Sequence, residues 1–214
     1  MNFEVENIKQ EVKIALDQNM SSEQLLDISD IDTLTFDQII ESKIADAARV
    51  VLLNAPNHLL DGGSSFGQSI SWFSREGLSG GYIVLPNDFL RLVSFQMSDW
   101  TRAVTTPISE NDPLYELQSS RFPGIRGCPQ NPIVALCSQS IGLVLEFYSC
   151  TAGAGVTVKK ATYIPIPKII SGYISFSEKL KPAIIYYTAY LTALSVGQAD
   201  LAAVMLNTSK ELMQ

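Results

Sequence analysis

Apolar residues recur at helical spacing near both ends of the chain and alternate with polar residues in its middle. One helical pattern covers residues 3–17, and another begins after Thr35 and continues to about Leu53. Thr35 is the expected N-cap of this second helix, because a threonine side chain accepts hydrogen bonds from free backbone N–H groups at a helix start. Near the C-terminus the pattern predicts two helices over residues 178–213, separated at Gly197.

The two C-terminal helices are expected to form an antiparallel hairpin that packs on the helix at residues 36–53. Four apolar residues at helical spacing predict the buried stripe of the first of them. These residues are Ile184, Tyr187, Leu191 and Leu194.

The stretch from Tyr82 to Met97 carries a β pattern and lies at the centre of the predicted fold. Two strand-like runs flank the turn Pro86-Asn87-Asp88, and strict alternation places Arg91 on the same face as Phe95. The alternation of a later run slips at Lys159-Lys160, which predicts a β-bulge or a strand that leaves the sheet there. Strands are also expected at 100–106, 133–137, 142–149 and 156–164, the last three as an antiparallel meander.

Two segments lack a regular pattern and predict long loops. Residues 61–81 are rich in glycine and residues 107–132 in proline, yet aromatic side chains occur in both. We expect these side chains to anchor the loops to their own domain or to a neighbouring subunit. The residues singled out for such an interface are Phe66, Trp72, Phe73, Trp100, Arg121, Phe122 and Arg126.

These elements predict an α+β fold. N-terminal helices and the C-terminal helical hairpin would pack together, with a central antiparallel β-sheet and long loops. The expected division is an acidic helical segment at 1–60, a β-rich region with long loops at 61–170, and the helical hairpin at 171–214.

The charge of the chain is concentrated near its N-terminal end. The 214 residues carry a formal net charge of −7, and residues 1–50 alone hold 11 acidic and 4 basic residues. Acids and bases balance in the remainder. Because phosphate binding needs clustered lysine and arginine, the acidic segment argues against nucleic-acid affinity. It suits a wall past which DNA slides without binding.

The three cysteines, Cys128, Cys137 and Cys150, form no Cys-x-x-Cys pair and predict free, mostly buried thiols. Residues 182–199 form the longest charge-free apolar stretch, which is too polar for a membrane span. The N-terminus lacks the pattern of a secretory signal. We therefore expect a soluble chain without membrane contact.

No catalytic pattern is visible in the sequence. His58 is the only histidine, no serine lies in a Gly-x-Ser-x-Gly elbow, and no spacing of His, Cys or Asp matches a metal site. We expect no catalytic residues, no cofactor and no bound metal. Carboxylates that meet only in three dimensions stay open as an alternative.

Two regions carry a resemblance to a known family. One is Leu85-Pro-Asn-Asp-Phe-Leu-Arg-Leu92, which leads into a strand. The other is Leu180-Lys-Pro-Ala-Ile-Ile-Tyr-Tyr-Thr-Ala-Tyr-Leu191 with its Gly-Gln-Ala-Asp-Leu-Ala-Ala continuation. Together they resemble the head-to-tail adaptor (connector or neck ring) proteins of tailed bacteriophages, a group that includes those of crAss-like podoviruses. The loops at 61–81 and 107–132 are longer than that family pattern.

The resemblance implies a structural virion protein of the phage neck or tail, assembled in the host cytoplasm. A homo-oligomeric ring, usually a dodecamer, would lie beneath the portal protein and extend the DNA channel. It would dock the next tail or neck ring protein, and DNA would pass through without specific binding. A β-rich ligand-binding or adhesion module and a small enzyme stay open as alternatives. A deep pocket with convergent carboxylates would be the structural sign of the enzyme.

Overall fold

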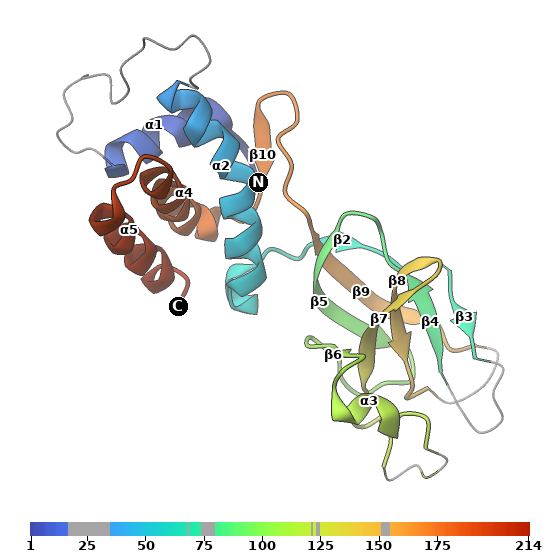
Figure 1. The fold of residues 1–214 in the computed structure, drawn as a ribbon. Helices are drawn as coiled ribbons and strands as arrows, with labels where there is room; N and C mark the ends of the chain where they lie inside the picture. Colours follow the sequence, from blue (N-terminus) through green and yellow to red (C-terminus); the bar gives the residue numbers. More distant parts are fainter. Residues whose placement is uncertain (17–34, 68, 74–79, 121, 123–124, 151–154) are drawn as a thin grey trace. The chain divides into compact units, whose positions relative to one another are not determined.

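The computed structural model describes residues 1–16, 35–67, 69–73, 80–120, 122, 125–150 and 155–214. Within these ranges the chain divides into two compact units (Figure 1). The helical unit comprises Met1–Asp61 and Ile166–Gln214, and the β unit comprises Gly62–Pro165. The fold is thus mixed α and β, with five α-helices and several antiparallel or mixed sheets in the described ranges.

The helical unit combines helices from both ends of the chain with a two-stranded sheet. Its helices are α1 (Val5–Leu16), α2 (Phe36–Asn54), α4 (Lys181–Ser195) and α5 (Ala199–Glu211), with short 3₁₀ helices η1 (Asn57–Leu59) and η2 (Glu178–Leu180). Strand β1 (Asn2–Glu4) pairs antiparallel with β10 (Tyr173–Ser175). The first helix therefore begins later than its periodicity predicts, because the residues before it pair as a strand.

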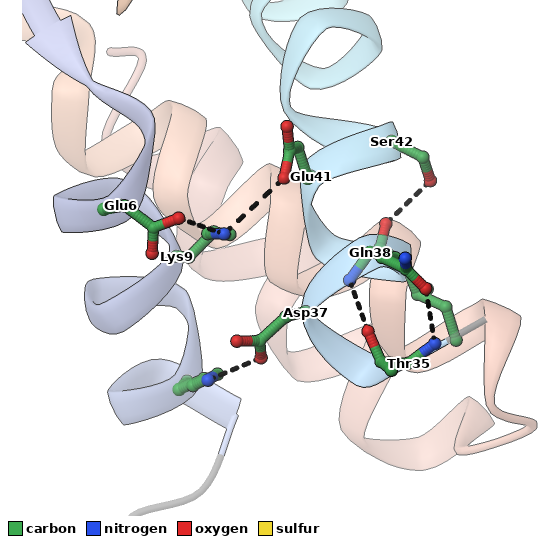
Figure 2. A network of polar contacts seen from close by, with 9 residues as sticks. Glu6, Lys9, Thr35, Asp37, Gln38, Glu41 and Ser42 are labelled. Atoms are coloured by element: carbon green, nitrogen blue, oxygen red, sulfur yellow. Dashed lines mark hydrogen bonds and ion pairs between the residues drawn. The ribbon is translucent and has the colours of Figure 1, made fainter. Parts of the chain in front are cut away.

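Thr35 caps α2, as predicted. Its side chain accepts a hydrogen bond from the backbone N–H of Gln38 at 3.4 Å, and the Gln38 side chain accepts one from the Thr35 N–H at 2.9 Å (Figure 2). This reciprocal capping box satisfies donors that the first turn of a helix leaves unpaired. The apolar stripe behind it is buried at Ile40, Ile44, Ala47 and Val51.

Lysine side chains of α1 join it to α2. The Nζ atom of the buried Lys9 lies 2.5 Å from Glu6 and 3.5 Å from Glu41 (Figure 2). The hydrogen bond to Glu6 raises the pKa of Lys9 despite the opposing effect of desolvation, so the ammonium group stays charged at neutral pH. Lys13 and Asp37 form a second link at 2.5 Å. Part of the acidic N-terminal segment is therefore used to pair helices.

Helix α4 buries a different face from the predicted stripe. It packs against α1, α2 and α5, and its buried residues are Ala183, Ile184, Ile185, Thr188, Ala189, Thr192 and Ala193. Leu194 is 47% exposed, so the prediction that it shares the buried stripe of Ile184 is wrong. Small residues on the buried face let several helices approach at once. The buried threonine hydroxyls donate to carbonyl oxygens one turn earlier, which satisfies them.

The β unit contains two sheets and a short helix. One sheet has the order β2-β9-β5, from β2 (Ser64–Ser65), β9 (Val158–Pro165) and β5 (Phe89–Met97). The other has the order β3-β4-β8-β7-β6, from β3 (Ser71–Trp72), β4 (Gly81–Val84), β8 (Gly142–Phe147), β7 (Val134–Gln139) and β6 (Ile108–Ser109). The β6–β7 pair is parallel and the others are antiparallel. Helix α3 (Pro113–Leu117) follows β6.

Some strands that are consecutive in the sequence, and were predicted to be neighbours, belong to different sheets. Strands β4 and β5 flank the turn Pro86-Asn87-Asp88 as predicted, but they belong to different sheets. Strands β7 and β8 form the expected hairpin, whereas β9 pairs with β5 and β2 instead of β8. The prediction of a three-stranded meander is therefore wrong.

The pairing of β5 with β9 contains three register shifts, and the first two, each with an extra residue in β5, keep the apolar side chains of β5 on the core face. The three shifts fall between Phe89 and Arg91, between Leu92 and Ser94, and between Gln96 and Met97. An extra residue in one strand reverses the side that the following residues face. Leu92, Phe95 and Met97 are consequently all buried, although they do not alternate strictly. The predicted common face of Arg91 and Phe95 is wrong for the same reason.

The third of these shifts confirms the predicted irregularity at Lys159-Lys160. Gln96 pairs with Lys160 and Met97 pairs with Val158, so Lys159 is the extra residue. The bulge lets Val158 reach the core, where it packs beside the buried residues of both sheets.

Aromatic side chains join the two sheets in one core. The rings of Phe95 on β5 and Phe147 on β8 are 5.8 Å apart, and Trp100 packs edge-on against Phe95 at 5.5 Å. The Trp100 indole N–H donates to the Ser149 carbonyl at 3.0 Å, which satisfies the one polar group of this buried ring. Residues 100–106 form only an isolated bridge at Val104, so the strand predicted there is wrong.

We expect the substitution Ile184→Ala to destabilise the protein by ~2–5 kcal/mol, because it leaves a cavity at a fully buried position of α4. The matched change Leu194→Ala on the same helix should cost less than about 1 kcal/mol, because this side chain is half exposed. Urea unfolding followed by circular dichroism measures both. Equal losses would contradict the buried face assigned to α4.

Candidate functional site

The aromatic residues of the glycine-rich loop pack on the β unit itself. Phe66 lies 6.2 Å from the ring of Phe95, and Trp72 contacts Phe147 edge-on at 5.5 Å. Phe73 is half-buried, whereas Trp72 keeps 42% of its surface exposed. This loop is therefore anchored to its own domain, which was one of the two expectations. An intersubunit contact through Trp72 stays a prediction.

The other residues singled out for an interface differ widely in exposure. Trp100 is 3% exposed and serves the core, so it offers no side-chain surface to a neighbouring subunit. Arg126 is half-buried, and Arg121 lies outside the described residues. Phe122, by contrast, is 70% exposed.

The buried side chain of Gln118 forms hydrogen bonds with residues before and after Phe122 in the sequence. The Gln118 side chain accepts a hydrogen bond from the Gly127 N–H at 2.9 Å and donates one to the Leu114 carbonyl at 2.8 Å. A Cβ atom at Gly127 would lie 2.3 Å from the Ser149 hydroxyl oxygen and 3.1 Å from the Ile133 nitrogen, so a larger residue there would force its neighbours to shift. These contacts fix Gln118 and Gly127, which lie on either side of Phe122 in the sequence.

Helix α3 precedes the loop that contains Phe122 and was missed in the sequence, where its prolines suggested an irregular segment. The Asp112 side chain accepts a hydrogen bond from the Leu114 N–H at 2.9 Å, and Pro113 occupies the first turn. An N-capping aspartate followed by proline is a helix-start signal that could have revealed α3. The helix and loop expose four apolar side chains, here called the loop cluster: Leu114 (45%), Leu117 (40%), Phe122 (70%) and Ile125 (50%).

The helical unit exposes a second apolar feature. Ile170 and Tyr173 exchange backbone hydrogen bonds of 2.9 and 3.0 Å across the turn Ser171-Gly172. Ile170 is 70% exposed and Tyr173 is 50% exposed. We call these two residues the hairpin pair. Sequence patterns did not single them out, because exposure of an apolar residue depends on the tertiary fold.

The β unit also contains a cavity of about 770 Å³ beside a buried carboxylate. Glu146 on β8 is only 7% exposed. Gln139 donates a hydrogen bond to its Oε1 atom at 2.8 Å. The Tyr115 hydroxyl donates to its Oε2 atom at 3.3 Å, and the Tyr148 hydroxyl donates to the same oxygen. Alternation along β8 places this carboxylate on the opposite face from Phe147 and the shared core.

The titratable neighbours of Glu146 stay protonated at neutral pH. Burial, as the largest cause, raises the pKa of both Tyr115 and Tyr148 above the ordinary phenol value, and Glu146 reinforces this effect. Burial likewise raises the pKa of the Cys137 thiol to about 12. The phenols therefore act as donors, and Cys137 is a thiol rather than a nucleophilic thiolate.

Glu116 and Glu146 both line the cavity. Two carboxylates in one pocket are among the features expected of a small enzyme. An activated nucleophile does not accompany them at Cys137. Within the described ranges, no group of three or more His, Cys, Asp or Glu residues is placed to hold a metal ion. His58 is exposed in η1 of the helical unit. The pocket thus offers hydrogen-bond acceptors and negative charge.

Comparison of the sequence with models of known protein families and with curated proteins finds no match. In the described part of the chain, none of the helices combines the length and apolar character needed to cross a membrane.

We expect iodoacetamide at pH 8 to modify native Cys128 well before Cys137 and Cys150. The pKa of each of these two thiols is raised to about 12, chiefly by burial, so very little reactive thiolate forms at pH 8. Peptide mass spectrometry of the labelled chain reports each site, and labelling in urea should make all three equally reactive. Rapid modification of native Cys137 would show an activated thiol and revive a catalytic interpretation of the pocket.

Proposed function

We propose that the chain is a structural subunit of a head-to-tail connector of a tailed bacteriophage, and that copies assemble head to tail into a ring. The resemblance in the Leu85–Leu92 and Leu180–Leu191 segments suggests the family. The observation that carries the proposal is the presence of two separate exposed apolar features, one on each unit: the loop cluster and the hairpin pair.

A closed ring needs two different, complementary surfaces on every copy. The loop cluster would supply one surface and the hairpin pair of the next copy the other. Exposed apolar side chains are favourable to bury on association, and aromatic residues such as Phe122 and Tyr173 supply much of the energy of protein interfaces.

The distribution of charge supports a ring around DNA. The helical unit holds 15 acidic and 8 basic residues, a net charge of −7, whereas the β unit holds 7 of each. Some of these acids pair with Lys9, Lys13 and Lys181, but the net charge is unchanged by such pairs. A ring that turns its helical units toward the channel would repel the phosphates and let DNA pass without binding.

The remaining parts of the proposal follow from the resemblance. The ring would be a dodecamer in the virion neck, with the portal protein on one side and the next tail or neck ring protein on the other. The two C-terminal helices α4 and α5 would form the helical hairpin of this family and belong to the subunit's own core.

A ligand-binding β module is the second candidate function. The cavity beside Glu146 favours it, because a pocket with a few converging polar groups is a typical small-ligand site.

Two single substitutions test the ring. Sedimentation velocity of the full chain over a wide concentration range should show association beyond a dimer. Phe122→Ser and Ile170→Ser should each abolish this association with little change in the thermal midpoint, since both side chains are 70% exposed. Each has a matched control of similar exposure in the same unit: Ile141→Ser (53%) for Phe122 and Ile14→Ser (65%) for Ile170.

The controls should assemble like the unmodified chain. A chain that stays monomeric at all concentrations, or controls that lose assembly as completely as the test variants, would overturn the proposed ring.

A further inference from the structure

The cavity beside Glu146 has more hydrogen-bond acceptors than donors. Tyr115, Gln139 and Tyr148 each donate a hydrogen bond to Glu146, and the Cys137 thiol is a further, weaker hydrogen-bond partner of the same carboxylate. Tyr115 and Tyr148 each give their single hydroxyl proton to this carboxylate. Their oxygen atoms can therefore only accept a further hydrogen bond. A ligand that completes this cluster must donate hydrogen bonds.

Negative charge dominates the same cavity. Glu146 is 7% exposed, and Glu116 on α3 adds a second, exposed carboxylate to the lining. Among the described residues, no lysine or arginine forms an ion pair with either carboxylate. A buried charge that is held only by neutral groups is costly, and a cation of matching geometry would offset part of that cost.

The apolar lining is suited to a flat or alkyl-bearing cation. The rings of Phe73 and Tyr148 stack at a centroid distance of 5.9 Å with an interplanar angle of 24°, and Leu117 adds an aliphatic side chain. The face of an aromatic ring attracts ammonium and guanidinium groups. The cavity of about 770 Å³ lies within the range of small-ligand pockets.

We propose that this pocket binds a guanidinium or primary ammonium group, with Glu146 as its counter-ion. The cation donates hydrogen bonds to the carboxylate and to the two phenol oxygens, and its apolar part lies against Phe73 and Leu117. Such a group can come from a free amine or guanidine compound, or from an arginine or lysine side chain of another protein. The proposal does not depend on ring formation.

Nuclear magnetic resonance titration of the full chain with methylguanidinium tests the proposal, with methylurea as a neutral ligand of similar shape. Backbone signals of β8 and α3 should shift in a saturable way with methylguanidinium and not with methylurea. Glu146→Gln should weaken binding by about tenfold or more, because the charged hydrogen bond is lost. Glu178→Gln, which removes an exposed carboxylate from the helical unit, should leave binding unchanged.

A second variant keeps the test decisive if Glu146→Gln fails to fold. Phe73→Leu retains an apolar wall but removes the aromatic face, and it should weaken methylguanidinium binding severalfold. Equal responses to methylguanidinium and methylurea would overturn the cation site. An affinity for methylguanidinium that is unchanged in both Glu146→Gln and Phe73→Leu would also overturn the cation site.

Binding of two further ligands distinguishes a small-molecule source of the cation from a protein side chain. Agmatine represents a free guanidine compound, and a glycine-flanked arginine peptide with blocked ends represents a side chain. Tighter binding of agmatine supports the small-molecule source, and tighter binding of the peptide supports the protein source. If neither ligand binds, the proposal is wrong.

Discussion

Pairing along β9 is the constraint on which the β unit depends. This strand lies between β2, the first strand of the unit, and β5, so the two ends of the inserted segment are hydrogen-bonded neighbours. Gly63 makes the approach possible: its φ is 73°, and a Cβ atom there would lie 2.3 Å from the Tyr163 carbonyl oxygen. Because strands at its two ends are hydrogen-bonded to each other, the β unit is held together independently of its more distant loops. Those loops can then expose side chains without loss of the strand pairing.

Local signals in the sequence predicted the four long helices and the longer strands, but not all partners of those strands. The cap at Thr35, the break at Gly197 and the slip at Lys159 are decided by neighbouring residues, so they could be predicted. The change of sheets at Pro86-Asn87-Asp88 is a long-range choice of partner, which alternation cannot reveal. The same limit explains Leu194: helical spacing identifies an apolar stripe, but the number of neighbouring helices decides which face is buried.

The candidate sites were less predictable for a related reason. Phe122 was correctly expected to lie in a loop, and its exposure makes it available for contact. Trp100 looked equally suitable in sequence, yet it fills the core between the two sheets. Glu146 gave no signal at all, because it is one acid in an alternating strand. Its importance arises only when Tyr115, Gln139 and Tyr148 converge on it from other positions in the chain.

Copies that associate through two different surfaces can be detected by mixing two complementary variants. Phe122→Ser damages the loop cluster, and Ile170→Ser damages the hairpin pair. In a mixture, the intact loop cluster of one variant can still contact the intact hairpin pair of the other, but no further copy can be added. Light scattering coupled to size exclusion should show a discrete heterodimer in the mixture only, if association uses both surfaces. Homodimers of either variant alone, or a mixture that stays monomeric, would contradict it.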